Sequence, residues 1–290
     1  MLQLPRELLS TVFSYLLPRA SLLERKFRFN YFEHRRLVLA SSKQTAICCA
    51  VCQDFRTATL PPTDLASPAL QRISRNRWII EDNRDGLLEW VELISASLLN
   101  RSSVLRLNLH GCSTLTTDLL MRILDGCSRL DRLDLNGCRS LDCKALLIVG
   151  AKCPQLTWLD LRGVVGAHDL AVKQMMADLT KGLEFLDLSH IWRISSLSLY
   201  SIAHSPSAKS IRRLMFAGNR AGSDGVVQLL NRCSFLKELD VAGNRDVNDS
   251  IIAGFQESEL KWIDLRGTSV TETGTEEIIQ TRPQLTLSIR

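Results

Sequence analysis

The chain has 290 residues, a formal net charge of +5 and an ordinary globular content of hydrophobic residues, 45%. No apolar run approaches the roughly 20 residues that a membrane-spanning helix needs, and the mild charge does not argue for a nucleic-acid-binding surface. Walker A, G-x-S-x-G and H-E-x-x-H motifs are absent from the sequence, so we expect no catalytic site, no cofactor and no metal site.

Near the N-terminus the sequence predicts two short helices. Apolar residues spaced three and four apart indicate the first: Leu8, Leu9, Val12, Phe13 and Leu16. Pro18 ends it, and no small-residue cleavage site follows, so we do not interpret this stretch as a signal peptide. Residues 45–59 show a second helical pattern, which stops at Pro61-Pro62.

The stretch between these helices is charged and aromatic. Residues 25–36 carry five Lys or Arg among four Phe or Tyr, which could contact nucleic acid or an anionic surface. Glu24 and Glu33 dilute the charge, so a solvated insertion is the favoured interpretation. Cys49 and Cys52, with Cys48 beside them, could form half a zinc site, but no second ligand pair follows at matched spacing. Buried helix cysteines explain them better.

Residues 61–103 read as a linker and an irregular N-terminal capping repeat. The linker is rich in Pro, Ser and scattered Arg. Residues 78–80, Trp-Ile-Ile, predict a degenerate strand, and residues 87–99 predict a helix. Together these two elements would cover the open end of the domain that follows.

Residues 104–290 contain seven matches to L-x-x-L-x-L-x-x-(N/C), the leucine-rich-repeat signature. The matches begin at residues 104, 130, 156, 183, 211, 236 and 260, which are 24 to 28 residues apart. In each match the L-x-L segment indicates a short strand, and a helical pattern follows. One repeat cannot bury both apolar faces alone, so the pattern predicts an α/β horseshoe solenoid of the ribonuclease-inhibitor-like kind. Residues 285–289 alternate in polarity and predict a last strand.

Five of the nine cysteines occupy equivalent positions in the repeats: Cys112, Cys127, Cys138, Cys153 and Cys233. Such placement is typical of small buried residues with a weak hydrogen-bond donor. An odd number of buried cysteines favours a reducing compartment, so we expect the protein in the cytoplasm or nucleus.

The N-terminal module resembles an F-box. Residues 4–16 read LPRELLSTVFSYL, and residues 51–56 read VCQDFR, which is similar to the V-C-x-x-W-R of the last F-box helix with Phe55 in place of Trp. Compared with that pattern, residues near 24–44 are inserted. An F-box followed by cysteine-containing leucine-rich repeats resembles the F-box/leucine-rich-repeat family over nearly the whole chain. The domains expected are an F-box-like module at 1–60, the linker and capping repeat at 61–103, and the repeats at 104–290.

This resemblance implies a substrate receptor of a cullin–RING (SCF-type) ubiquitin ligase, without chemistry of its own. In that family the F-box docks on a Skp-type adaptor, and the repeats hold a protein substrate for ubiquitin-dependent degradation. The positions that match the adaptor-binding motif are Leu4, Pro5, Leu8, Leu9, Val12, Phe13, Leu16, Val51 and Phe55. The alternatives are a leucine-rich-repeat scaffold unrelated to ubiquitin ligation and, with least support, a nucleic-acid binder that uses residues 25–36.

The concave wall of the solenoid is where we expect the substrate. If the strands alternate, the third, fifth and seventh positions of each motif face this wall. The candidate substrate-binding residues there are Arg132, Asp134, Trp158, Asp160, Phe185, Asp187, Arg213 and Trp262. Trp158 and Phe185 are expected to be exposed and to touch, because they hold equivalent positions in adjacent repeats. Aspartate at the fifth position also belongs to the repeat pattern, so generic strand chemistry is the competing explanation for it.

Overall fold

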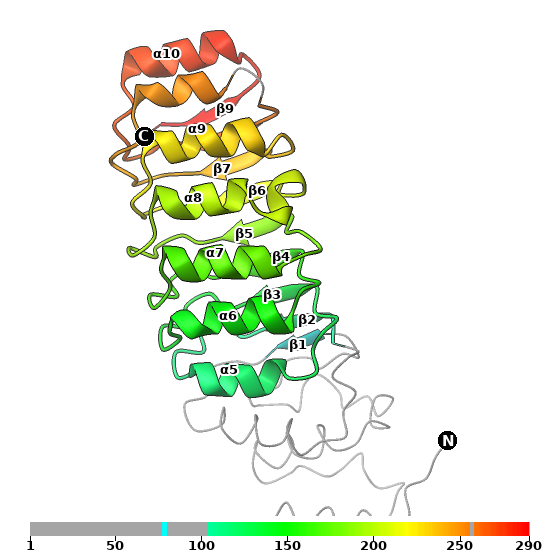
Figure 1. Cartoon of the computed structure of the whole chain (residues 1–290). Coiled ribbons are helices and arrows are strands. Elements are labelled where there is room, and N and C mark those ends of the chain that lie inside the picture. The colour runs from blue at the N-terminus through cyan, green and yellow to red at the C-terminus, as the bar shows by residue number, and fades with distance from the viewer. Residues whose placement is uncertain (1–76, 80–103, 256–257, 290) are drawn as a thin grey trace, which may run out of the picture.

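The computed structural model describes residues 77–79, 104–255 and 258–289. These residues form a solenoid in which strands make one layer and helices make the other (Figure 1). The F-box-like module at 1–60, its insertion, the linker and the helix expected at 87–99 lie outside the described residues. Those expectations therefore remain predictions.

The strand layer is one parallel sheet of nine described strands, arranged in chain order. The strands are β1 (Arg77–Ile79), β2 (Arg106–Asn108), β3 (Arg132–Asp134), β4 (Trp158–Asp160), β5 (Phe185–Asp187), β6 (Arg213–Met215), β7 (Glu238–Asp240), β8 (Trp262–Asp264) and β9 (Thr286–Ser288). Every pair from β2 to β8 aligns equivalent motif positions, such as Leu133 opposite Leu159. β1 confirms the degenerate strand, starting one residue earlier than expected, and β9 confirms the last strand.

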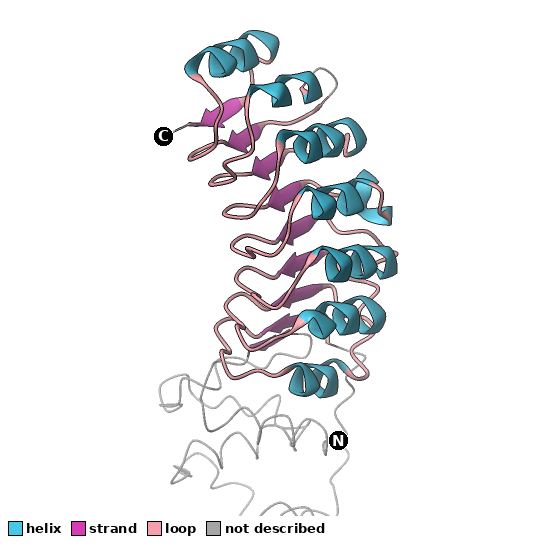
Figure 2. Ribbon diagram, turned by 60° about the vertical axis from the view of Figure 1, so that its left-hand side comes forward, coloured by secondary structure: helices cyan, strands magenta, loops and turns pink. Residues whose placement is uncertain are grey.

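The helices cover the other face of the sheet (Figure 2). They are α5 (Thr117–Leu124), α6 (Cys143–Lys152), α7 (Asp169–Asp178), α8 (Ser196–Ala203), α9 (Ser223–Arg232) and α10 (Glu272–Thr281), with 3₁₀-helices η5 (Pro206–Lys209) and η6 (Asp249–Gly254). In the sixth repeat, which at 24 residues is the shortest, η6 takes the place of the expected α-helix. No helix in the described ranges is both long and apolar enough to cross a membrane.

The core lies between the two layers. Leu133 and Leu135 of the second repeat are fully buried. The equivalent residues of the first, third, fourth and fifth repeats are at most 2% exposed. The N/C position of the motif ties neighbouring turns together. Cys138 Sγ donates to the Leu109 carbonyl at 3.1 Å, and Asn219 Nδ2 donates to the Leu188 carbonyl at 2.9 Å. Burial with a backbone acceptor explains why Cys and Asn share this position.

The spacing of the two layers makes the sheet face concave. Parallel strands lie about 4.8 Å apart, whereas packed helices need about 8–10 Å between their axes. The helical layer must therefore be longer than the strand layer over the same number of repeats. The sheet consequently presents an inner face that nine strands share.

Candidate functional site

Three rows of side chains point from the strands and their C-terminal ends onto the concave face. From β2 to β8, the third row is Arg106, Arg132, Trp158, Phe185, Arg213, Glu238 and Trp262; the fifth row is Asn108, Asp134, Asp160, Asp187, Met215, Asp240 and Asp264; the seventh row is His110, Asn136, Arg162, Ser189, Ala217, Ala242 and Arg266. Residues between these rows are buried in the core, so the predicted alternation is confirmed.

Trp158 and Phe185 form an aromatic pair on adjacent strands. Their ring centroids are 4.7 Å apart and the ring planes differ by 8°, so the expected contact is present. Stacking covers part of each ring, and both side chains are half-buried rather than fully exposed. Exposed Arg132 and Arg213 flank the pair in the third row. Trp262 is also half-buried, but it lies three strands away from Phe185 and does not join this pair.

The fifth-row aspartates have a structural role at the end of each strand. In six repeats the fifth-row side-chain oxygen accepts a hydrogen bond from the backbone N–H two residues later: Asn108, Asp134, Asp160, Asp187, Asp240 and Asp264. This Asx turn satisfies an N–H group where the strand ends. Met215 cannot accept this bond, and the Ala217 N–H donates instead to Ser189 Oγ of the preceding repeat at 3.2 Å. Generic strand chemistry therefore explains why aspartate recurs in the row.

Asp187 also forms an ion pair within the protein. Arg162 reaches from β4 to the next strand and donates from Nε and Nη2 to Asp187 Oδ2, at 3.1 and 2.7 Å. The Asp187 side chain is only 1% exposed, whereas Arg162 is about half exposed. Asp187 therefore does not present a free carboxylate on the wall, which differs from the role expected for it. Arg266 pairs in the same manner with buried Asp264 of its own strand.

Asp134 and Asp160 remain without a strong cationic partner. In the described part of the chain neither carboxylate has a Lys or Arg within ion-pair distance, and only His110 approaches Asp134, at 3.9 Å. Burial raises the pKa of Asp160 to about 6, helped by negative Asp187 and Asp134 and opposed by the Arg162 amide and charge. Burial likewise raises the pKa of Asp134. Asp134 is half-buried and Asp160 is 9% exposed, so these two carboxylates on adjacent strands lie within the wall without a paired Lys or Arg, and a cation from a partner would complement them.

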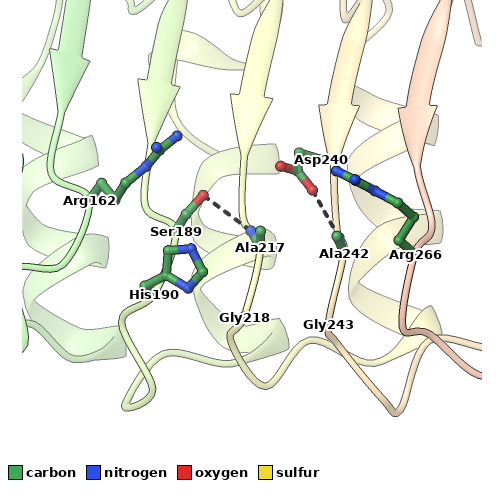
Figure 3. Close-up of a pocket in the computed structure, with 9 residues that line it drawn as sticks. All are labelled: Arg162, Ser189, His190, Ala217, Gly218, Asp240, Ala242, Gly243 and Arg266. Atoms are coloured by element: carbon green, nitrogen blue, oxygen red, sulfur yellow. Dashed lines mark hydrogen bonds between the residues drawn. The ribbon is translucent and has the colours of Figure 1, made fainter. Parts of the chain in front are cut away.

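A hollow of about 360 Å³ opens farther along the wall, at the C-terminal ends of the strands (Figure 3). Its lining residues are Arg162, Ser189, His190, Ala217, Gly218, Asp240, Ala242, Gly243 and Arg266. In Figure 3 the two arginine side chains extend from opposite sides toward the small residues that follow β6 and β7, such as Ala217 and Ala242. Burial raises the pKa of Asp240, and Arg266 opposes that rise.

His190 is unusual in this hollow. It has φ of 60°, whereas the equivalent residue of every other repeat is a glycine with positive φ. Its imidazole lies over Gly218, where an added Cβ would come within 2.7 Å of Nδ1. This hollow was not predicted from the sequence. Two features of the sequence could have indicated it: the small seventh-row residues Ala217 and Ala242, and a histidine at a position where the other repeats have glycine.

Comparisons with known proteins show the fold of this chain and not its function. No protein-family model and no curated protein match it. Among solved structures, the complex of Rad7 and Elc1 in yeast is similar at 20% identity and a TM-score of 0.59, over 72% of this chain and 52% of that one. The leucine-rich-repeat-containing protein LegL7 from Legionella pneumophila has 20% identity and a TM-score of 0.41, over 62% and 61% of the two chains. The TLR13–ssRNA13 complex has 14% identity and a TM-score of 0.42, over 69% and 30%.

The chain is thus a leucine-rich-repeat solenoid, and it spans about half the length of the first of these matches.

Proposed function

We propose that this chain binds a protein on its concave face and serves as the substrate-recognition subunit of a cullin–RING (SCF-type) ubiquitin ligase. The observation that carries the binding role is the Trp158–Phe185 stack beside Asp134 and Asp160. Aromatic side chains concentrate binding energy at protein interfaces, and desolvated carboxylates without a cation favour a complementary charge. The proposal assigns no reaction and no cofactor to the chain.

The rows on the wall favour a partner segment of mixed charge. An apolar side chain of the partner would pack on the aromatic pair, and a Lys or Arg beside it would meet Asp134 and Asp160. Exposed Arg132 on one side favours an acidic residue farther along the same segment, whereas Arg213 on the other side already pairs with Glu238 at 3.2 Å. Arg162 adds little to this field, because Asp187 neutralises it within the protein.

The link to a ubiquitin ligase rests on the F-box resemblance of residues 4–16 and 51–56, which lie outside the described residues. A chain of the same fold, Rad7, forms a complex with Elc1 in yeast, which is a precedent for such a solenoid in a protein assembly. A Skp-type adaptor is the partner proposed for the N-terminal module, and the cytoplasm or nucleus is the proposed location.

The adaptor is tested with the full chain and a purified Skp-type adaptor by isothermal titration calorimetry. We expect micromolar or tighter binding, and we expect Leu8→Ala with Phe13→Ala to abolish it, because a few apolar anchors dominate such interfaces. Ile279→Ala on α10 is the matched control, since this exposed apolar residue lies in the last repeat. Circular dichroism melting checks that each variant keeps the repeats folded.

Absence of adaptor binding by the intact chain at micromolar concentration would remove the ligase role. The remaining function would then be a leucine-rich-repeat interaction scaffold, because the concave wall does not depend on the N-terminal module for its side chains.

A further inference from the structure

A separate surface stands out on the edge of the solenoid where strands lead into helices. Figure 2 shows these loops stacked along one edge. Two positions on this edge hold large exposed apolar side chains in the third and fourth repeats: Val165, Leu170, Trp192 and Leu197, with exposed fractions of 39%, 68%, 62% and 61%. We call these four residues the loop-edge patch.

Both positions are polar or small in every other repeat. Val165 and Trp192 directly follow the N/C position, where the other repeats have Ser113, Arg139, Arg220, Arg245 and Ser269. Leu170 and Leu197 are the second residues of α7 and α8, where the other repeats have Asp118, Lys144, Asp224, Ser250 and Thr273. Core packing does not require apolar residues here, since five repeats fold without them. Equivalent positions in adjacent repeats stack, so the four side chains gather on two neighbouring repeats.

Arginines surround the loop-edge patch. Arg139 and Arg220 hold the equivalent position in the flanking repeats, Arg245 follows one repeat later, and Arg193 lies beside the Trp192 ring with its Cζ 5.8 Å from the ring centroid. In the described part of the chain, none of these four guanidinium groups takes part in an ion pair. The N-termini of α6 to α9 open onto the same edge and add positive partial charge.

Three carboxylates on this edge accept hydrogen bonds from other groups of the protein. Asp142 caps α6, Asp169 accepts from Ser195, and Asp224 accepts from the Tyr200 hydroxyl. Asp246 is the exposed acid that remains near Arg245. These carboxylates keep their negative charge, but in the described part of the chain none of them lies within ion-pair distance of the four arginines, so the guanidinium groups remain available to an acidic ligand.

We propose that the loop-edge patch is a second docking surface, and that it takes an acidic amphipathic segment of a partner protein. Apolar side chains of that segment pack on Trp192, Leu170 and Leu197, and its Asp and Glu residues meet Arg139, Arg193 and Arg220. The inference does not depend on the concave site or on adaptor binding, because it uses different residues on a different edge.

To test this proposal, short peptides are selected from a random display library on the immobilised full chain. The affinity of each enriched peptide for the chain is then measured by fluorescence anisotropy. We expect a class of peptides with two or more large apolar residues and an excess of Asp and Glu. Trp192→Ser with Leu197→Ser should weaken this class by at least about tenfold. Arg193→Glu with Arg220→Glu should weaken it to a similar degree and reduce its dependence on salt.

Two controls locate the effect. Ile279→Ser removes an exposed apolar residue on α10 and should leave the affinity unchanged, as should Trp158→Ala on the concave wall. The proposal is overturned if no enriched peptide depends on Trp192 and Leu197, or if those that do are neutral or basic. Peptides that depend on Trp158 alone would support the concave site and count against this one. Thermal melts of each variant separate lost binding from lost folding.

Discussion

Trp158 and Phe185 lie in register on β4 and β5, and their rings stack with centroids 4.7 Å apart. The stack runs along the sheet, from one repeat to the next, so it couples two repeats through a surface that a partner can also contact. The pair stabilises the contact between the two repeats, and in the proposed complex it would also contact the partner, so the two contributions can be measured separately.

A double-mutant cycle on Trp158→Ala and Phe185→Ala should give a coupling free energy of about 0.5–1.5 kcal/mol in urea unfolding, because stacked aromatic pairs gain this much beyond burial. Trp158 combined with Trp262, three strands beyond Phe185, is the control cycle and should be additive. Additive behaviour of the Trp158–Phe185 pair would mean that the rings do not stack in solution.

Leu133 and Leu159 are buried strand residues. Changing either one to Ala should lower the free energy of unfolding by about 2–5 kcal/mol, because the substitution leaves a cavity in a close-packed core. Leu197→Ala is the matched control, since the same atoms are removed from an exposed position. Chemical denaturation should show a small effect there, within about 0.5 kcal/mol. Equal effects at both kinds of position would contradict the assigned alternation.

Two ion pairs of the wall, Arg162–Asp187 and Arg213–Glu238, should differ strongly in their effect on stability. Arg162→Ala leaves the buried Asp187 carboxylate without its cation and should cost about 2–4 kcal/mol. Arg213→Ala breaks a pair with Glu238, 3.2 Å apart but solvent-exposed on both sides, and should cost no more than about 1 kcal/mol. Denaturant titration at neutral pH measures both. A larger loss for Arg213→Ala than for Arg162→Ala would refute the assignment of Asp187 to the interior.

Because of Asp160, the free energy of unfolding should fall as the pH rises from about 4 to about 6. Its pKa in the folded state is raised from 3.8 to about 6, so the folded protein binds more protons than the unfolded chain in this window. Asp160→Asn should remove this dependence and stabilise the protein at pH 7 by about 1–3 kcal/mol, while the amide oxygen still accepts from the Arg162 N–H. Unfolding curves at several pH values test this, and an unchanged pH profile for the variant would refute it.

Gly218→Ala should be destabilising for two reasons, and one of them depends on His190. Gly218 has φ of 65°, which strains an alanine, and the added Cβ would meet the His190 ring. Gly111→Ala has the same kind of strain, and within the described residues its added Cβ would have no atom within 4 Å, so it should cost about 1 kcal/mol and Gly218→Ala more. In a His190→Gly background, Gly218→Ala should cost no more than Gly111→Ala, because the ring that the added Cβ would meet is gone. Thermal melts of the four variants suffice to check this.

The sequence alone determined the repeating part of the fold. A period of about 26 residues with alternating leucines places the strands, their register and the buried face, because each repeat contacts only its neighbours and obeys local rules. The same alternation brought Trp158 and Phe185 together on the wall. Residues 1–60 carry the F-box resemblance, but the described structure does not reach them.

Only the tertiary structure decided which charges on the wall are available. Arg162 follows the strand of Asp160, yet it pairs with Asp187 of the next strand, so Asp160 has no paired cation to offset the burial that raises its pKa. Which carboxylate an arginine pairs with depends on distances between side chains of neighbouring strands, and the spacing of residues along the chain does not give these distances. The loop-edge patch has the same origin: Val165 and Trp192 are single residues one repeat apart in the sequence, and stacking of the repeats makes them one surface because equivalent positions lie side by side.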